Sequence, residues 1–431
     1  MDAAPARTLG FWSCWSLTVG TMIGSGVFTL PAVLAKYGLL SFGGWLISGA
    51  GSVLLALTVA RLAGRTTRSG GPYAYAHEAF GDLTGFLIAW GYWASYWIAI
   101  PAVAIAFAGY LPVLSPAFAT PMAQAFAALA LIWTLTLVAI RGVRETALLQ
   151  IAMTVLKLAP LLAVIAAGFL AGDRALLPPV NPSGAAPLAA FAATALLTSW
   201  AFSGLEAGCL PAGNVRDPER TIPRAVVIGT LTVTAVYFAV TAAVMLLVPA
   251  NALQHSSAPL ADAARALGAW GPTFVAIGAL VATAGALNGV IFICGQLPMV
   301  VAIDRLAPAA FARVNAGCAP TVSLLVSSVL GTVLLAANYT RGAIVAFTFL
   351  LTMATITSLA PLLVSAIAEV RHSWRNARAW ASVAALAGAF CLFAIIGSGI
   401  EAIAWGIVLL IVGLPAYYWG RAAPRAVTET R

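Results

Sequence analysis

The chain has 431 residues, of which 62% are hydrophobic and only 8% are charged, and it carries a formal net charge of +9. A soluble protein has roughly 25% charged residues to cover its surface, so this composition excludes an ordinary soluble fold and indicates lipid as the solvent. The basic residues are scattered between apolar runs, so we expect no nucleic-acid partner, and the positive excess is typical of membrane topology.

Twelve apolar segments follow one another with short loops between them. A helix that spans a lipid bilayer needs about 20 apolar residues, so a chain of this length accommodates roughly twelve such helices. We therefore predict an all-α integral membrane protein with twelve transmembrane helices. The segments are residues 9–37, 41–63, 84–111, 121–140, 146–171, 187–213, 223–248, 270–302, 319–337, 342–368, 379–398 and 402–419.

The loops between these segments alternate in charge. With the N-terminus in the cytoplasm, 17 lysine and arginine residues fall on the inner side and 4 on the outer side, which leaves Lys157 within a span. Because cytoplasmic loops collect Lys and Arg, this bias supports both the number of spans and their orientation. We expect a multi-pass protein of the bacterial inner membrane with both termini in the cytoplasm.

Segments 1 and 6 contain glycine-rich interruptions at corresponding positions, five helices apart. Residues 20–26 include three glycines, and Gly204 lies close to Glu206 in the sixth segment. Such paired interruptions indicate a transporter that is built from inverted repeats. On these interruptions alone we predict a first repeat of five helices, a second repeat of five, and two further helices, over residues 9–171, 187–368 and 379–419.

An interrupted helix leaves backbone N–H and C=O groups without partners, and in lipid each such group costs several kcal/mol. The carboxylate of an amino acid can accept from the N–H groups, and its ammonium can donate to the carbonyl groups. One zwitterion thus satisfies both interruptions, and we favour amino acids over sugars or lipids as substrates. We place the helix breaks at Gly20, Gly24 and Gly204. Close helix packing is the alternative interpretation of Gly20, Gly24 and Gly26.

Two ionisable residues, Glu206 and Lys157, lie deep within apolar segments. A charged side chain at the bilayer centre costs about 2.5–3.5 kcal/mol on insertion scales, so each residue requires an explanation. We expect Glu206 to act in proton coupling or pH sensing, with a hydrogen-bonded contact between helices as the alternative. The ammonium of Lys157 can lie near exposed carbonyl groups where a sodium ion would otherwise sit, and a structural contact and a proton site both stay open.

Aromatic residues near the interruptions are further candidates. Trp200 lies close to the interruption in segment 6 and can cover a substrate, while Tyr92 and Tyr96 share one helix face at i, i+4 spacing. Ordinary packing is the alternative for each of them. The five cysteines and three histidines show no metal-ligand spacing, so we expect no metal site, no cofactor and no catalytic centre.

Five motifs occur in order along nearly the whole chain: GTMIGSGVFTLPA at 20–32, SGGPYAYAHEAFG at 69–81, WAFSGLEA at 200–207, NVRDPERTIPRA at 214–225, and a stretch at 295–315. With these motifs the chain resembles the amino acid–polyamine–organocation superfamily, and within it the basic amino acid/polyamine antiporter branch, to which arginine–agmatine antiporters belong. The resemblance implies two inverted five-helix repeats with two trailing helices, and alternating access to a central site.

The resemblance also implies roles for single residues. Ile23, Ser25 and Gly26 hold the carboxylate and amine ends of the substrate, and Trp200 stacks on its side chain. Tyr92 lines the gate, and Glu206 senses pH. The full set of residues predicted to bind substrate is Ile23, Ser25, Gly26, Tyr92, Tyr96, Trp200, Ser203 and Val290.

The identity of the substrate stays open. Where arginine–agmatine antiporters have a gating tryptophan and a polar residue, this chain has Val290 and Ile100, which suit a guanidinium less well. An amino acid/amine antiporter of the arginine–agmatine type is the leading prediction. A proton-coupled permease or exchanger of neutral amino acids, with Lys157 as the proton site, is the alternative, and a non-transporting membrane sensor is an alternative of another class. Expected partners are an amino acid or amine, protons and the lipid bilayer, and a homodimer stays open.

Overall fold

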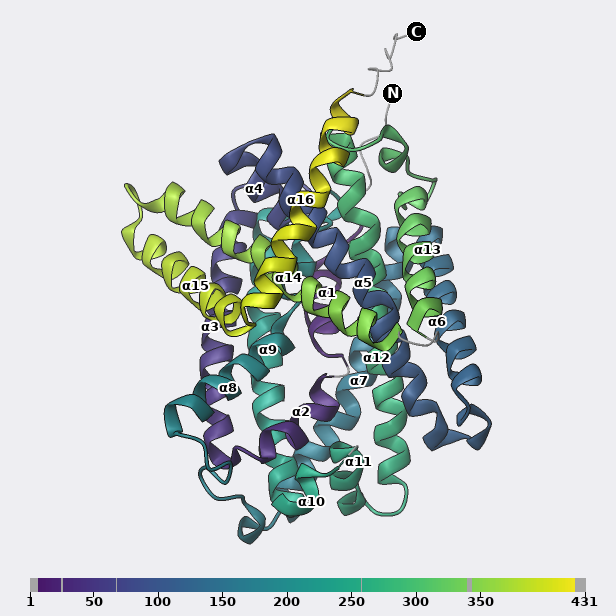
Figure 1. Ribbon diagram of the computed structural model, residues 1–431, viewed down its shortest axis with the longest axis vertical. Coiled ribbons are helices and arrows are strands. Elements are labelled where there is room, and N and C mark those ends of the chain that lie inside the picture. Colours follow the sequence, from purple (N-terminus) through teal and green to yellow (C-terminus); the bar gives the residue numbers. More distant parts are fainter. Residues whose placement is uncertain (1–6, 25, 67, 257, 339–342, 423–431) are drawn as a thin grey trace.

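The computed structural model describes residues 7–24, 26–66, 68–256, 258–338 and 343–422 (Figure 1). Within these ranges the backbone forms α-helices and short 3-10 turns without any β-strand, and an isolated β-bridge joins the chain just before the first helix to the chain before α9. The all-α class predicted from the sequence is therefore confirmed.

Sixteen α-helices follow one another in the described chain. They are α1 (Phe11–Met22), α2 (Gly26–Ala35), α3 (Ser41–Ala63), α4 (Pro72–Phe80), α5 (Asp82–Leu114), α6 (Pro121–Arg141), α7 (Val143–Ala171), α8 (Pro187–Ser199), α9 (Pro218–Leu247), α10 (Ala250–Gln254), α11 (Pro259–Ala263), α12 (Gly271–Ile303), α13 (Thr321–Asn338), α14 (Ala343–Ser373), α15 (Arg378–Gly397) and α16 (Ile400–Ala422). Between α8 and α9 the chain forms the 3-10 turns η4 (Trp200–Phe202), η5 (Leu205–Cys209) and η6 (Ala212–Asn214).

Eight of the helices in the described residues are long and apolar enough to cross a membrane, namely α3, α5, α6, α7, α9, α12, α15 and α16. Helices α1 and α2 pass the same test together, although the chain bends by 42° between them. Helix α8 and most of α13 are apolar but shorter. The chain is thus a multi-pass membrane protein in which every predicted segment contains a helix, while the number of twelve spans stays a prediction.

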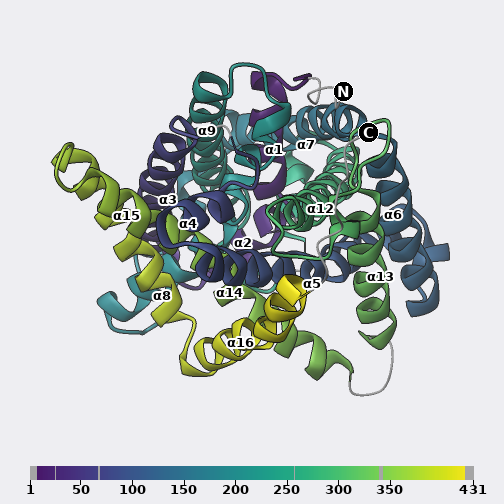
Figure 2. The ribbon, with the colours of Figure 1, turned by 90° about the horizontal axis from the view of Figure 1, so that it is seen from above.

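Helix α12 lies at the centre of the bundle. Its most apolar stretch is 89% buried, whereas the corresponding stretch of α16 is 22% buried and lies at the periphery (Figure 2). Small residues let its neighbours approach closely: a Cβ atom on Gly278 would lie 2.2 Å from Pro160 Cγ of α7, and one on Gly289 would lie 2.3 Å from Thr21 Oγ1 of α1. Glycine supports such close helix contacts in membranes, and here it brings α1 and α7 together against α12.

Helix α4 lies at one end of the bundle, and α10 and α11 lie at the other (Figure 1). At the first of these, which we call the α4 end, Asp304 at the end of α12 accepts from Arg68 Nη2 and from Tyr73 Oη, each at 2.6 Å. Burial, together with the hydrogen bond to this carboxylate, raises the pKa of Tyr73 well above its ordinary value. Tyr73 therefore keeps its proton and donates to Asp304.

A second group of ion pairs at the α4 end joins α3 to α14. The fully buried carboxylate of Glu369 accepts from Arg61 Nε at 2.9 Å and from Arg65 Nη1 at 2.5 Å, and Ser373 donates to it at 2.5 Å. Removing one partner of a buried ion pair leaves an uncompensated buried charge, which lowers the stability of the fold by about 3–5 kcal/mol. The two groups of ion pairs therefore connect the ends of α3, α4, α12 and α14 and the chain between α3 and α4 at this end of the bundle.

Candidate functional site

The first helix break lies between α1 and α2. Helix α1 ends at Met22, and Ile23 adopts an extended conformation with φ −77° and ψ 91°. Its N–H still donates to Val19 O, but the N–H of Gly24 donates to Met22 O, so the regular helical ladder stops here. The interruption predicted in the first segment is present, and Gly24 lies within it.

The prediction of a helix break at Gly20 is wrong. Gly20 lies inside α1, two residues before the helix ends. A Cβ atom there would lie 2.0 Å from Gln150 Nε2 and 2.6 Å from Thr154 Oγ1. Glycine is therefore required at this position because α1 packs directly on the polar face of α7. Close helix packing was the alternative interpretation of Gly20.

The second break follows α8. The chain passes from η4 through Gly204, whose φ of +96° is in the left-handed region, into η5, where Glu206 lies. A Cβ atom on Gly204 would lie 2.5 Å from Thr21 Cγ2, at the end of α1. The two interruptions, almost 180 residues apart in the sequence, are therefore in direct contact.

Lys157 of α7 joins α7 to the end of α1. Its fully buried ammonium donates to Gly20 O and to Ile23 O, each at 2.6 Å. These are two of the carbonyl groups that the end of a helix leaves without an intrahelical donor. The lysine thus supplies a positive charge and two hydrogen bonds to the first break.

Tyr237 of α9 contacts both breaks at once, and the sequence analysis missed it. Its fully buried hydroxyl lies 2.7 Å from Met22 O and 3.1 Å from Ala201 O, while its ring packs against Trp45 and Phe202. A signal was available: Tyr237 is the only tyrosine in the apolar segment 223–248. A buried tyrosine hydroxyl requires a hydrogen-bond partner, and an interrupted helix is the main source of free acceptors in a membrane.

Glu206 connects η5 to α5. Its Oε1 accepts a hydrogen bond from Tyr92 and a second one, of 3.2 Å, from Tyr96. The i, i+4 spacing predicted this shared face for the two tyrosines. The other carboxylate oxygen, Oε2, is buried without a hydrogen-bond partner among the described residues. The acid therefore keeps one free acceptor in the interior of the bundle.

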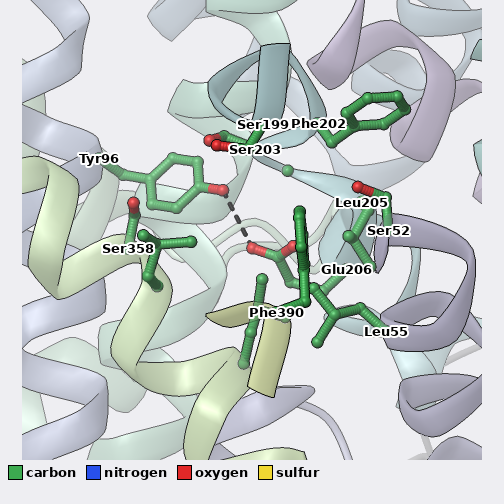
Figure 3. Close-up of a pocket in the computed structure, with 13 residues that line it drawn as sticks. Ser52, Leu55, Tyr96, Ser199, Phe202, Ser203, Leu205, Glu206, Ser358 and Phe390 are labelled. Carbon is green, nitrogen blue, oxygen red and sulfur yellow. Dashed lines mark hydrogen bonds between the residues drawn. The ribbon is translucent and has the colours of Figure 1, made fainter. Parts of the chain in front are cut away.

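A narrow cavity of about 20 Å³ adjoins this carboxylate. Figure 3 shows the hydroxyl of Tyr96 pointing to Glu206, with Ser199 and Ser203 beside it. Ser52 also lines the cavity, and its hydroxyl, like Glu206 Oε2, is buried without a partner in the described chain. Unpaired polar atoms around a cavity define a place where a polar ligand or water gains hydrogen bonds.

A larger cavity of about 300 Å³ shares part of this lining. Ser199, Ser203 and Ser358 line both cavities, and the larger one continues to Leu30 and Val33 of α2. The two cavities are therefore neighbours, one beside the Glu206 carboxylate and the other beside α2. Ser203, which was predicted to bind substrate, lies between the two cavities.

The other predicted site residues occupy several environments. Ile23 is fully buried and offers its carbonyl to Lys157, and Gly26 begins α2. Val290 is buried on α12 and lines neither cavity. Trp200 begins η4, but its side chain lies outside the described part of the structure, as does all of Ser25.

Two interrupted helices in contact, enclosed by long apolar helices, define a membrane transporter. The sequence pattern of the amino acid permease family matches residues 9–417, so the chain belongs to this family, as the resemblance predicted. The chain is 31% identical over 420 residues to the cadaverine/lysine antiporter of Escherichia coli strain K12, with 94% of each chain covered. It is 28% identical over 434 residues to the putrescine transporter PotE of the same strain, with 99% of this chain and 98% of the relative covered. The family consists of transporters, so the protein is not an enzyme.

Proposed function

We propose that this protein exchanges amino acids and related amines across the membrane by alternating access. The observation that carries the proposal is the contact between the two interruptions at Gly204 and Thr21, with the carbonyl groups of both breaks gathered around one tyrosine hydroxyl. Substrate sites in inverted-repeat transporters form where two discontinuous helices meet.

The charges of the breaks favour a zwitterion. The carbonyl groups of Gly20 and Ile23 already accept from Lys157, so the acceptors left for a substrate ammonium lie around Tyr237. A phenol has one proton and can donate to Met22 O or to Ala201 O at one time, which leaves the other carbonyl for the ammonium. The N–H groups at the start of α2 suit the carboxylate. The predicted roles of Ser25 and Gly26 fit this placement of the carboxylate, whereas the carbonyl group of Ile23 is already used by Lys157.

Exchange of an amino acid for an amine is the type of transport that we favour. The relatives carry the names of antiporters or transporters for cadaverine, lysine and putrescine. The free Oε2 of Glu206 suits a second ammonium group. The arginine–agmatine type stays within this proposal. Exchange of neutral amino acids is the second candidate, because Ile100 and Val290, where arginine–agmatine antiporters have a polar residue and a gating tryptophan, are buried apolar residues here.

We also propose the membrane arrangement of the chain. The two inverted repeats comprise residues 9–171 and 187–368, followed by helices at 379–419, which gives twelve spans. The arginines of the α4 end support its placement in the cytoplasm of a bacterial cell, with both termini on that side of the inner membrane.

Counterflow in proteoliposomes tests the proposed function. Vesicles loaded with unlabelled lysine, arginine, cadaverine, agmatine, alanine or leucine are diluted into labelled lysine, and uptake is compared with that of protein-free vesicles. We expect uptake to be stimulated by cationic amino acids and by the amines. The experiment is repeated with labelled alanine. Uptake that is stimulated only by internal alanine and leucine would favour an exchanger of neutral amino acids. Binding of lysine or alanine without any flux would contradict transport and favour the sensor.

A further inference from the structure

A separate cavity of about 330 Å³ lies at the α4 end, away from the helix breaks. The start of α7 contributes Arg144 and Leu148, and the chain before α9 contributes Arg216. Thr8 and Ser13, around the start of α1, add two hydroxyl groups. None of the seven described residues that line this cavity is acidic. The cavity therefore combines two guanidinium groups with hydroxyl donors.

Backbone pairing fixes the position of Arg216. The Leu9 N–H donates to Asn214 O at 3.0 Å, and the Arg216 N–H donates to Leu9 O at 2.8 Å. The Nε of Arg216 donates to Arg7 O at 3.0 Å. This contact uses one of the five N–H donors of the guanidinium, so the arginine is held in place with most of its donors available.

Both arginines of the cavity lack an acidic partner in the part of the chain that the structure describes. Within the described chain, Arg144 and Arg216 form no ion pair, and both are exposed. The neighbouring acid, Glu145, turns its carboxylate toward the start of α7, where a Cβ atom on Gly142 would lie 2.2 Å from its Oε2. Two unpaired guanidinium groups attract an anion with oxygen acceptors, and arginine binds phosphate in a bidentate manner.

An apolar face leads away from this cavity along α7. Leu148, Val155 and Leu162 follow one another at intervals of seven residues, and each is more than half exposed. Residues at this spacing lie on one side of a helix. Trp12 of α1, which precedes the cavity residue Ser13, is 64% exposed, and tryptophan is typical of the membrane–water interface. The ligand that matches this surface has an anionic head and apolar chains.

We propose that this cavity binds the phosphate of an anionic phospholipid, with the acyl chains along Leu148, Val155 and Leu162 of α7. Arg144 and Arg216 hold the phosphate, and Thr8 and Ser13 donate to its oxygens. Because the cavity joins the start of α1 to α7 and to the chain before α9, the lipid contacts all three. Figure 2 shows α1 between α7 and α9. Basic pockets between transmembrane helices bind anionic headgroups in this manner.

Native mass spectrometry of the purified full chain tests the proposal. The protein is mixed with equal amounts of phosphatidylglycerol and phosphatidylcholine, and the lipid retained on each molecule is identified. We expect one retained phosphatidylglycerol in the wild type. The double variant Arg144→Gln/Arg216→Gln is expected to lose about 30-fold in affinity, since each arginine near a membrane surface contributes about a factor of five. Arg378→Gln, an exposed arginine at the start of α15, is the matched control and keeps the lipid.

Three outcomes would overturn the proposal. They are equal retention of the two lipids by the wild type, unchanged retention by the double variant, and displacement of the lipid by inorganic phosphate at equal concentration, which would identify a site for soluble anions. A double variant that retains normal lysine counterflow and an unchanged melting temperature has folded. If the double variant does not fold, Arg144→Lys/Arg216→Lys, which keeps both charges, is compared with Arg144→Gln alone. We then expect the lysine variant to retain phosphatidylglycerol and Arg144→Gln to retain less of it.

Discussion

At the centre of the molecule, three buried side chains form hydrogen bonds at or beside the two helix breaks. Lys157 donates to the end of α1, Tyr237 lies between the carbonyl groups of both breaks, and Glu206 accepts from two tyrosines of α5. Each side chain provides a hydrogen bond to backbone or side-chain atoms that would otherwise lack a partner, because lipid offers none. Lys157 and Glu206 were predictable, because a charge is conspicuous in an apolar segment, whereas Tyr237 resembles an ordinary aromatic residue in the sequence.

Glu206→Gln is expected to flatten the pH dependence of exchange. Glutamine keeps an oxygen that accepts from Tyr92 and Tyr96, so the protein should fold, but it cannot gain or lose a proton. The measurement is lysine counterflow from acid to neutral pH. The exposed acid Glu401 at the start of α16 provides the control variant Glu401→Gln. A pH profile parallel to that of the wild type would remove the proposed role of Glu206.

Lys157→Ala is expected to reduce proton-coupled uptake at least about tenfold, because Gly20 O and Ile23 O lose their donor at a cost of about 1–3 kcal/mol each. The initial rate of uptake with and without an imposed proton gradient checks this. The only other lysine of the chain, Lys36, is exposed, and Lys36→Ala serves as the control. Full uptake and coupling in Lys157→Ala would show that transport requires neither the two hydrogen bonds of Lys157 nor a proton on its ammonium group.

At the scale of elements, the interruptions were predicted more reliably than their boundaries. The glycines located both breaks, because only an interruption or a close contact explains glycine in an apolar helix. The glycines could not distinguish these two causes. Gly20 allows close contact with α7, and Gly24 lies in a break, while Gly204 both lies in a break and makes a close contact. The difference depends on Gln150 and Thr154, whose distance from α1 is a property of the tertiary structure.

Gly204→Ala is expected to abolish exchange and lower the melting temperature. Alanine at φ +96° is strained by about 1–3 kcal/mol, and its Cβ atom would collide with Thr21. Gly399→Ala provides the matched control, because Gly399 has φ +90° but no heavy atom within 4 Å of its ideal Cβ position. If both variants lose the same activity, strain alone explains the effect, and the contact between the two breaks is unimportant.

At the scale of the whole molecule, the helical class and the family were predictable from composition and motifs, and both are confirmed. The ion pairs of the α4 end were not predictable, because they join residues that are distant in the sequence. Arg68 meets Asp304, and Arg61 meets Glu369, across more than 200 residues. Charge alternation placed the basic members of these pairs on one side of the membrane but could not identify their acidic partners.

Asp304→Asn is expected to open the α4 end more often, because Arg68 loses its ion pair there. Two buried cysteines, Cys14 and Cys209, report this opening, since Cys209 lies under the chain that leads to α4. In a Cys318→Ser background, labelling by a membrane-impermeant maleimide in inside-out vesicles should increase. Asp262→Asn, at the opposite end, should leave labelling unchanged. Equal labelling of the wild type and Asp304→Asn would show that the ion pair does not hold this end closed.

The ion pairs of the α4 end have a further consequence, because they join separate elements. At the opposite end, by contrast, the ion pair of Asp262 and Arg265 joins neighbouring residues of a single short segment. Mobile ions screen exposed charges that lie farther apart than about 10 Å at ordinary ionic strength, and they screen buried pairs much less. We therefore expect added salt to weaken mainly the more exposed pair of Arg68 and Asp304, while the fully buried carboxylate of Glu369 keeps its two arginine partners.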